Sequence, residues 1–153
     1  MFSLFRKKAN DFFSAEEKEK ILSAIQKSEQ TTSGEIRVYV EHRCRFVDAI
    51  DRAAEVFYSL KMNQTVHHNA TLVYVALKDR QMAVFGDEGI YSKTGKEFWN
   101  DAVKKMVKNF NKENYAQGII EVVEQIGAAL AHHFPYDAST DKNELPDDIV
   151  FGK

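Results

Sequence analysis

Residues 72–89 read LVYVALKDRQMAVFGDEG, and this stretch decides the fold. Its first six residues are an apolar run rich in valine, which predicts a buried strand. The polar residues 78–80 predict a tight turn, and the apolar run after them predicts a second, antiparallel strand. Two glycines then bracket the carboxylates of Asp87 and Glu88 where that second strand must end. Buried strands need cover on both faces, so we expect helices on both sides of a sheet.

Regular patterns flank this hairpin on both sides. Ser14 and Glu17 have the spacing of a capping box, which begins a helix, and Pro135 cannot continue one. Between these limits, apolar residues recur at helical spacing in four segments and alternate with polar residues in one. The predicted segments, in chain order, are a helix at 14–31, a strand at 35–41, a helix at 48–60, the two hairpin strands, a helix from residue 94 or 95, and a helix at 115–132.

The order of these elements predicts an α/β fold. A strand, a crossover helix and a second strand should form a parallel, right-handed unit, to which the hairpin adds an antiparallel strand. A mixed sheet in a sandwich of two or three layers results. We expect an N-terminal arm at 1–13, one α/β domain at 14–136 and an acidic tail at 137–153. Within the tail, the apolar residues 149–151 could dock as an edge strand or bind a partner.

Composition excludes several classes of function. Lys and Arg total 21 against 23 Asp and Glu, so no strong field favours nucleic acid or a membrane surface. Cys44 is the only cysteine, so the chain can form neither an internal disulfide nor a thiolate metal cage. No apolar run approaches the length of a membrane span, and no signal-peptide core begins the chain. We therefore expect a cytoplasmic location.

The N-terminal arm mixes apolar and basic side chains. It could be a small amphipathic segment that contacts a membrane or a partner, which could itself be membrane-associated, or a short arm whose phenylalanines pack on the domain. We favour packing on the domain, because so short a segment buries little area on a membrane. The residues concerned are Phe2, Leu4, Phe5, Phe12 and Phe13, with Arg6, Lys7 and Lys8.

Two familiar phosphate-binding motifs are absent. Residues 89–97 follow a predicted strand and precede a predicted helix, as a phosphate loop would. Their spacing is one residue too long, and Glu97 stands where a magnesium-binding hydroxyl belongs. A cysteine phosphatase loop around Cys44 would need an arginine six positions later, where the chain has Ile50. Neither chemistry is predicted.

Strand directions gather polar residues at one edge of the sheet. Suppose that the first two strands are parallel and the third is antiparallel. The first strand then starts at Glu35 and the second at His68 and Asn69, both at one edge of the sheet. The third strand ends at that same edge, and Asp87 and Glu88 directly follow it. Carboxylate and amide oxygens are the ligands that Ca²⁺ and Mg²⁺ prefer. The sequence therefore predicts a divalent-cation site made by the three carboxylates and the Asn69 amide.

The opposite edge gathers Glu41, His42 and Asp79. Ligands of open α/β sheets usually bind at this carboxyl edge. Asp79 lies in the tight hairpin turn, however, where aspartate is common for conformational reasons alone. We therefore place the stronger hypothesis at the acidic loop.

Several motifs together resemble the TPM-domain family. They are TSGEIRV at residues 32–38, LVYVALKDR at 72–80 and GDEGI at 86–90, and the step NYAQG at 114–118 is also similar to that family. The resemblance covers roughly residues 14–134. The family includes thylakoid-lumen proteins linked to photosystem II repair, a nematode receptor modulator and many bacterial proteins of unassigned role.

The resemblance carries its own expectations. It implies an α/β/α sandwich of Rossmann-like appearance, an association with acid phosphatase activity, and divalent-cation binding by acidic residues in some members. By position, Glu35, Asp87 and Glu88 are the residues that would hold the cation. Many members are exported and membrane-anchored beyond the domain, whereas this sequence shows neither a signal nor an anchor.

Two functions are compatible with these residues. The first is a binding or regulatory module whose cation stiffens the loops that meet a partner. We favour it because no nucleophile is evident and only Arg37 and Lys93 are basic nearby. The alternative is a metal-dependent phosphoester hydrolase of the acid phosphatase kind, in which the cation polarises a phosphoryl oxygen and His68 acts as acid or base.

Overall fold

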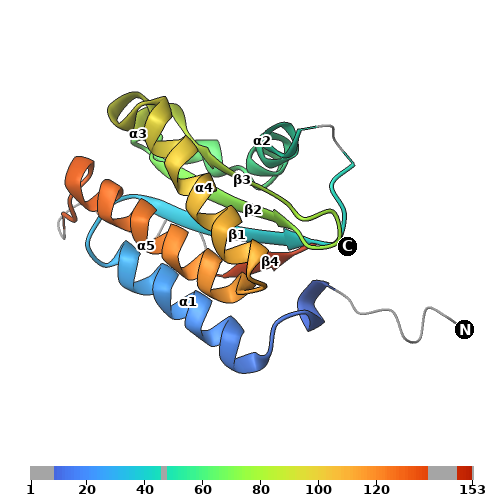
Figure 1. Ribbon diagram of the computed structural model, residues 1–153. Coiled ribbons are helices and arrows are strands. Elements are labelled where there is room, and N and C mark those ends of the chain that lie inside the picture. The colour runs from blue at the N-terminus through green and yellow to red at the C-terminus, as the bar shows by residue number, and fades with distance from the viewer. Residues whose placement is uncertain (1–8, 46–47, 138–147, 153) are drawn as a thin grey trace, which may run out of the picture.

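A four-stranded mixed sheet organises the computed structural model, which describes residues 9–45, 48–137 and 148–152 (Figure 1). The strand order is β3-β2-β1-β4. β1 runs parallel to both β2 and β4, and β2 runs antiparallel to β3. The predicted parallel unit with an added antiparallel strand is thus confirmed. The strands are β1 (Glu35–Glu41), β2 (Ala70–Ala76), β3 (Gln81–Gly86) and β4 (Ile149–Phe151).

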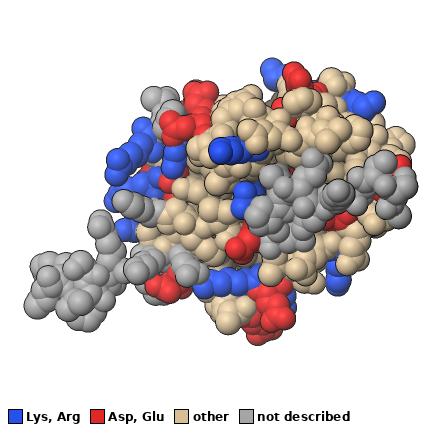
Figure 2. All heavy atoms as spheres, turned by 180° about the vertical axis from the view of Figure 1, so that it is seen from behind, with Lys and Arg blue, Asp and Glu red and all other residues tan. Residues whose placement is uncertain are grey.

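Helices cover the two faces of the sheet unequally. Three helices lie over one face, and α2 (Ala49–Ser59) lies over the other, so the molecule is a three-layer α/β/α sandwich (Figure 1). Basic and acidic side chains are interspersed on the face that carries α2 (Figure 2). The three helices of the first layer are α1 (Ala15–Glu29), α4 (Lys96–Asn111) and α5 (Tyr115–His133), and short 3-10 turns occupy Ala9–Asp11 and Met62–Gln64.

The helix starts follow from local chemistry. The Ser14 hydroxyl accepts a hydrogen bond from the Glu17 backbone N–H at 3.1 Å, and the Glu17 carboxylate accepts one from the Ser14 N–H at 2.9 Å. This is the predicted capping box, and it satisfies two donors at the start of α1. Asp48 precedes α2 as predicted, but its side chain makes no capping hydrogen bond.

One helix was not predicted. Residues of the acidic loop and of the rejected phosphate loop form α3 (Glu88–Thr94). Asp87 has extended backbone angles, and its carboxylate accepts the Glu88 N–H at 2.8 Å, which makes it the N-cap of this helix. Gly95, with φ of 80°, ends α3 and begins α4. Only Ile90 of α3 is buried, so no apolar periodicity revealed the helix.

Two apolar clusters fill the sandwich. Between the sheet and α1, α4 and α5 lie the side chains of Ile36, Val38 and Val73. Between the sheet and α2 lie Leu72 and Tyr74. All seven residues of β2 are buried, as a central strand covered on both faces requires.

The inner face of α2 differs from the prediction at one position. The helical spacing of residues 48–60 predicts that Ile50 faces inward with Ala53, Ala54, Phe57 and Leu60, but Ile50 is 45% exposed. Val56 is buried in its place, only 2% exposed. The apolar stripe therefore runs along positions 53, 56 and 57, one helical step away from Ile50.

The apolar end of the tail docks in the sheet. Ile149 lies opposite Val38 in the parallel pairing of β4 with β1, and Ile149 is buried in the core. The Gly152 N–H extends the pairing by donating to the Val40 carbonyl at 2.8 Å. Of the two roles open to residues 149–151, the structure thus shows the edge strand. Among the described helices, none combines the length and apolar character that crossing a bilayer requires.

Candidate functional site

The sheet register brings the predicted site residues to one edge. Glu35, the first residue of β1, lies opposite Ala70, the first residue of β2. The Asp87 N–H, just past the end of β3, donates to the Ala70 carbonyl at 3.0 Å. Glu35 and Asp87 therefore flank Ala70 in one row across three strands, and Asn69 adjoins that row. The predicted strand directions are what place them together.

Three of the four predicted cation ligands are buried. Glu35 is 2% exposed, Asn69 is fully buried and Asp87 is 6% exposed. Glu88, at the first position of α3, has an exposed side chain and faces solvent instead. Buried carboxylates are unfavourable unless charges or hydrogen bonds compensate them. The environment of these buried oxygens therefore decides what the edge can bind.

The Asn69 side chain has an unsatisfied acceptor. Its Nδ2 donates to the Ser33 hydroxyl at 3.2 Å. Its Oδ1 is fully buried, and no hydrogen bond reaches it from any described residue. A buried amide oxygen without a donor loses the full desolvation energy of that group, so such atoms commonly mark an unseen ligand or water.

Asp87 and His68 form a pair beside this amide. One Asp87 oxygen accepts the Glu88 N–H, and the other lies 3.1 Å from His68 Nδ1. The His68 side chain is about half exposed, so this imidazole reaches solvent while it touches a buried carboxylate. Its backbone adopts a left-handed conformation, φ 49°, held by a hydrogen bond from its N–H to the Thr65 carbonyl.

Gly89 allows the histidine turn to pack against α3. A Cβ atom at Gly89 would lie 2.2 Å from the His67 carbonyl oxygen and 2.4 Å from that of His68. The His68 carbonyl also accepts the Ile90 N–H at 3.3 Å. Because backbone atoms cannot yield as a side chain can, only glycine fits here. The Gly-bracketed acidic motif thus joins α3 to the turn before β2.

The donor set fits a hard cation in part. Within residues 9–45, 48–137 and 148–152, no group of three or more His, Cys, Asp or Glu side chains is placed to hold a metal ion. The edge offers the carboxylates of Glu35 and Asp87 and the orphan oxygen of Asn69. Oxygen donors of this kind suit Ca²⁺ or Mg²⁺, and both ions complete their coordination with water.

The opposite edge holds a buried ion pair. Arg52 of α2 donates to both oxygens of Glu41, from Nε at 2.8 Å and from Nη2 at 2.9 Å. The Tyr74 hydroxyl donates to the same carboxylate. Burial is the larger cause and the hydrogen bond to Glu41 the next, and together they raise the pKa of Tyr74 far above its ordinary value. The hydrogen bonds from Arg52 to Glu41 likewise raise the pKa of Arg52. The Glu41 oxygens thus have several donors, which favours a structural role.

Arg52 and Tyr74 were missed in the sequence. Each interrupts an apolar pattern, Arg52 beside the buried stripe of α2 and Tyr74 inside the buried strand, and such an interruption was the available signal. Asp79, predicted at this edge, accepts the Cys44 N–H at 2.7 Å and pairs with Arg43. It clamps the turn to the loop after β1, as its hairpin position suggested.

Comparison with known proteins decides the family. The family model of the TPM domain matches residues 7–129. The chain belongs to the TPM-domain family. Among solved structures, this TPM domain resembles the BA42 protein of the psychrophilic bacterium Bizionia argentinensis, at 38% identity and a TM-score of 0.85, over 95% of this chain and 99% of that one.

A more distant solved structure shares the fold of this TPM domain. It is the N-terminal domain of the cg2496 protein from Corynebacterium glutamicum, at 14% identity and a TM-score of 0.63, over 88% of this chain and 80% of that one. At that identity the likeness shows the fold alone. Curated proteins provide no match.

Proposed function

We propose that this TPM domain is a binding or regulatory module that holds a divalent cation, Ca²⁺ or Mg²⁺, at the edge formed by the starts of β1 and β2 and the end of β3. The observation that carries the proposal is the fully buried Asn69 Oδ1, which accepts no hydrogen bond from the described residues. Asn69 directly precedes Ala70, which lies opposite Glu35 in the sheet register and accepts the Asp87 N–H, and the side chains of Glu35 and Asp87 are also buried. A cation would satisfy this oxygen and attract the carboxylate of Asp87.

The number of protein ligands sets the expected affinity. Two carboxylates and one amide are fewer charged donors than tight calcium sites use, so we expect a Kd of about 10⁻⁴–10⁻³ M. Glu88 stands next to Asp87 but is exposed, and it adds negative charge near the site. A bound cation would link three segments, the start of β1, the 67–69 turn and the start of α3. Separate hydrogen bonds hold each of these segments in the structure. This stiffened surface is the one that a protein partner would meet.

Asp87→Asn should abolish the response to cation while leaving the fold intact. Asparagine is as good an N-cap as aspartate, so α3 should persist, but one of the two carboxylates is lost. For the wild-type chain at tenfold excess over Kd, linkage predicts about 1.4 kcal/mol of stabilisation, a rise in Tm of roughly 3–6 °C. Thermal unfolding with increasing CaCl₂ or MgCl₂ measures both proteins.

Glu97→Gln is the matched control, because this exposed carboxylate also lies in the first turn of a helix. It should keep the wild-type response. If wild type shows no rise in Tm with either cation, or if Asp87→Asn retains the rise, the proposed site is refuted.

A second candidate function is phosphoester hydrolysis assisted by the same cation. The observation in its favour is the His68–Asp87 contact, which pairs a solvent-reaching imidazole with a buried carboxylate, as acid–base catalysts often are. This function predicts cation-dependent release of phosphate from a generic phosphoester, reduced about 10²-fold or more in His68→Gln. Turnover no higher than that of buffer with cation alone would leave the binding module as the function.

A further inference from the structure

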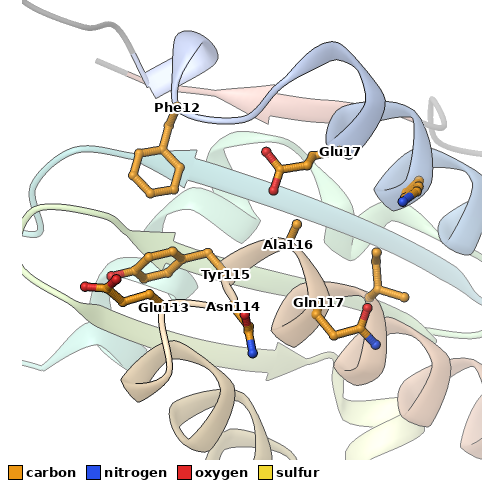
Figure 3. Close-up of a pocket in the computed structure, with 9 residues that line it drawn as sticks. Phe12, Glu17, Glu113, Asn114, Tyr115, Ala116 and Gln117 are labelled. Atoms are coloured by element: carbon orange, nitrogen blue, oxygen red, sulfur yellow. The ribbon is translucent and has the colours of Figure 1, made fainter.

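A groove opens between the first turns of α1 and α5 (Figure 3). Its volume is about 600 Å³, and it lies away from the sheet edge that carries Asp87. Phe12 and Tyr115 lie next to each other on one side of it, and Ala116 forms part of its floor (Figure 3). The full lining is Phe12, Glu17, Lys20, Glu113, Asn114, Tyr115, Ala116, Gln117 and Ile120.

The walls of the groove carry exposed aromatic surface. Phe12 is 37% exposed although it packs edge-to-face against Phe13 at 5.0 Å and Tyr115 at 5.2 Å between ring centroids. Tyr115 in turn packs against Phe110 at 4.9 Å, which holds it in place. Phe12 and Tyr115 thus form one aromatic wall, and one side of it is uncovered by the described residues.

The rim of the groove has an excess of negative charge. Among the described residues that line it, Lys20 alone is basic, and it is paired with Glu16 at 3.2 Å. Glu17 and Glu113 remain, and no described basic side chain forms an ion pair with either. The groove thus suits an occupant that is both aromatic and basic.

Glu113 occupies a position that glycine normally takes. Its φ is 61°, and hydrogen bonds from the Glu113 N–H to the Phe110 carbonyl and from the Asn114 N–H to the Asn109 carbonyl, each 2.9 Å, close the end of α4. A glycine would adopt this left-handed conformation without strain, so glutamate is conformationally unfavourable here. The carboxylate at the rim is the feature that glycine could not supply.

We propose that this groove is the docking site of the chain's own residues 1–8. That segment, MFSLFRKK, lies outside the described residues and carries two phenylalanines, a leucine and three basic side chains. Its charge of +3 complements the two carboxylates of the rim, and its apolar side chains match the exposed Phe12 and the half-buried Tyr115. The proposal is independent of the cation site.

The segment has the reach to fill the groove. It joins the described chain at Ala9, whose carbonyl accepts the Phe12 N–H at 3.2 Å, so it leaves the fold beside the aromatic wall. Eight extended residues span at most about 26–29 Å. Because the attachment is covalent, the segment has a high effective concentration at the groove and needs only weak contacts to dock.

A spin label on the segment tests this docking in the full-length chain. In a Ser3→Cys, Cys44→Ser variant with a nitroxide on the new thiol, the amide NMR signals of Ala116 and Gln117 should lose intensity strongly. The amide of Ala128, toward the other end of α5, should keep its intensity. Glu113→Gln should lower the docked-to-free ratio about two- to fivefold and partly restore the groove signals. Glu121→Gln, which removes an exposed carboxylate of α5 that does not line the groove, should leave them unchanged.

Two measurements keep the test decisive. In the unsubstituted chain, nuclear Overhauser contacts should be observed between the ring of Phe2 or Phe5 and the ring of Tyr115. The same contacts should be observed in the Cys44→Ser variant. A mixture of two proteins distinguishes docking within one chain from docking between two copies. One protein carries the spin label but no isotope label, and the other carries the isotope label but no spin label. Absence of the Overhauser contacts, equal loss of signal at Ala116 and Ala128, or loss only in the mixture would overturn the proposal.

Discussion

Replacing Arg52 with alanine should lower the free energy of unfolding by about 3–5 kcal/mol. The side chain of Glu41 is only 7% exposed, and Arg52 supplies two of its hydrogen bonds. Without Arg52 the carboxylate stays buried with its charge uncompensated, which is the situation that makes breaking a buried pair so unfavourable. Chemical denaturation followed by circular dichroism measures the loss, and Tm should fall by roughly 6–20 °C.

The reason for the loss can be isolated with a second substitution. Adding Glu41→Gln to Arg52→Ala removes the unpaired charge and should recover part of the stability. Arg43→Ala is the matched control, because the Arg43–Asp79 pair is 3.5 Å long and Arg43 is largely exposed. It should change stability by less than about 1 kcal/mol. An Arg52→Ala protein as stable as the Arg43→Ala protein would contradict the buried-pair interpretation.

Gly89→Ala should be destabilising by about 1–3 kcal/mol, although it lies within a helix. Helix propensity alone would make alanine the better residue by nearly 1 kcal/mol. The new Cβ, however, would lie 2.2 Å from the His67 carbonyl oxygen, so the 67–68 turn or α3 must move. Because the proposed ligand Asn69 directly follows that turn, the variant should also weaken the stabilisation by Ca²⁺ or Mg²⁺. Thermal unfolding with and without cation measures both effects.

Ser92→Ala separates propensity from packing in the same helix. Ser92 is exposed, and its hydroxyl bonds only the Gly89 carbonyl among the described residues. This variant should be neutral or slightly stabilising, by up to about 0.5 kcal/mol, and should keep the cation response. A Gly89→Ala protein that is more stable than wild type would show that the turn does not press on α3 as the structure places it.

Much of this fold was predictable because its elements have strong local signals. The capping box at Ser14 and Glu17 marked α1, alternation marked β1, and the valine-rich run marked the central strand β2. Strand direction then followed from connectivity, since a crossover helix makes its two strands parallel. Strand direction alone was enough to predict that Glu35 and Asp87 lie at the same edge of the sheet.

The remainder depends on contacts that no local pattern encodes. Helix α3 has one buried residue and is defined by the Asp87 cap and by Gly95, so its sequence is also typical of a loop. The exposure of Glu88 follows from that helix, because its first residue turns outward once Asp87 becomes the cap. The Arg52–Glu41 pair joins residues of α2 and β1, and only tertiary packing determines that they meet.

The central claim, a divalent cation at the edge shared by β1, β2 and β3, is tested most directly by an NMR titration of the isotope-labelled chain with CaCl₂ and MgCl₂. We predict saturable shifts of the amide signals around Glu35, Asn69 and Asp87, including the Asn69 side-chain amide, with a common Kd of about 10⁻⁴–10⁻³ M. Shifts confined to the acidic residues 137–153, or no saturable shift at the edge, would contradict the account.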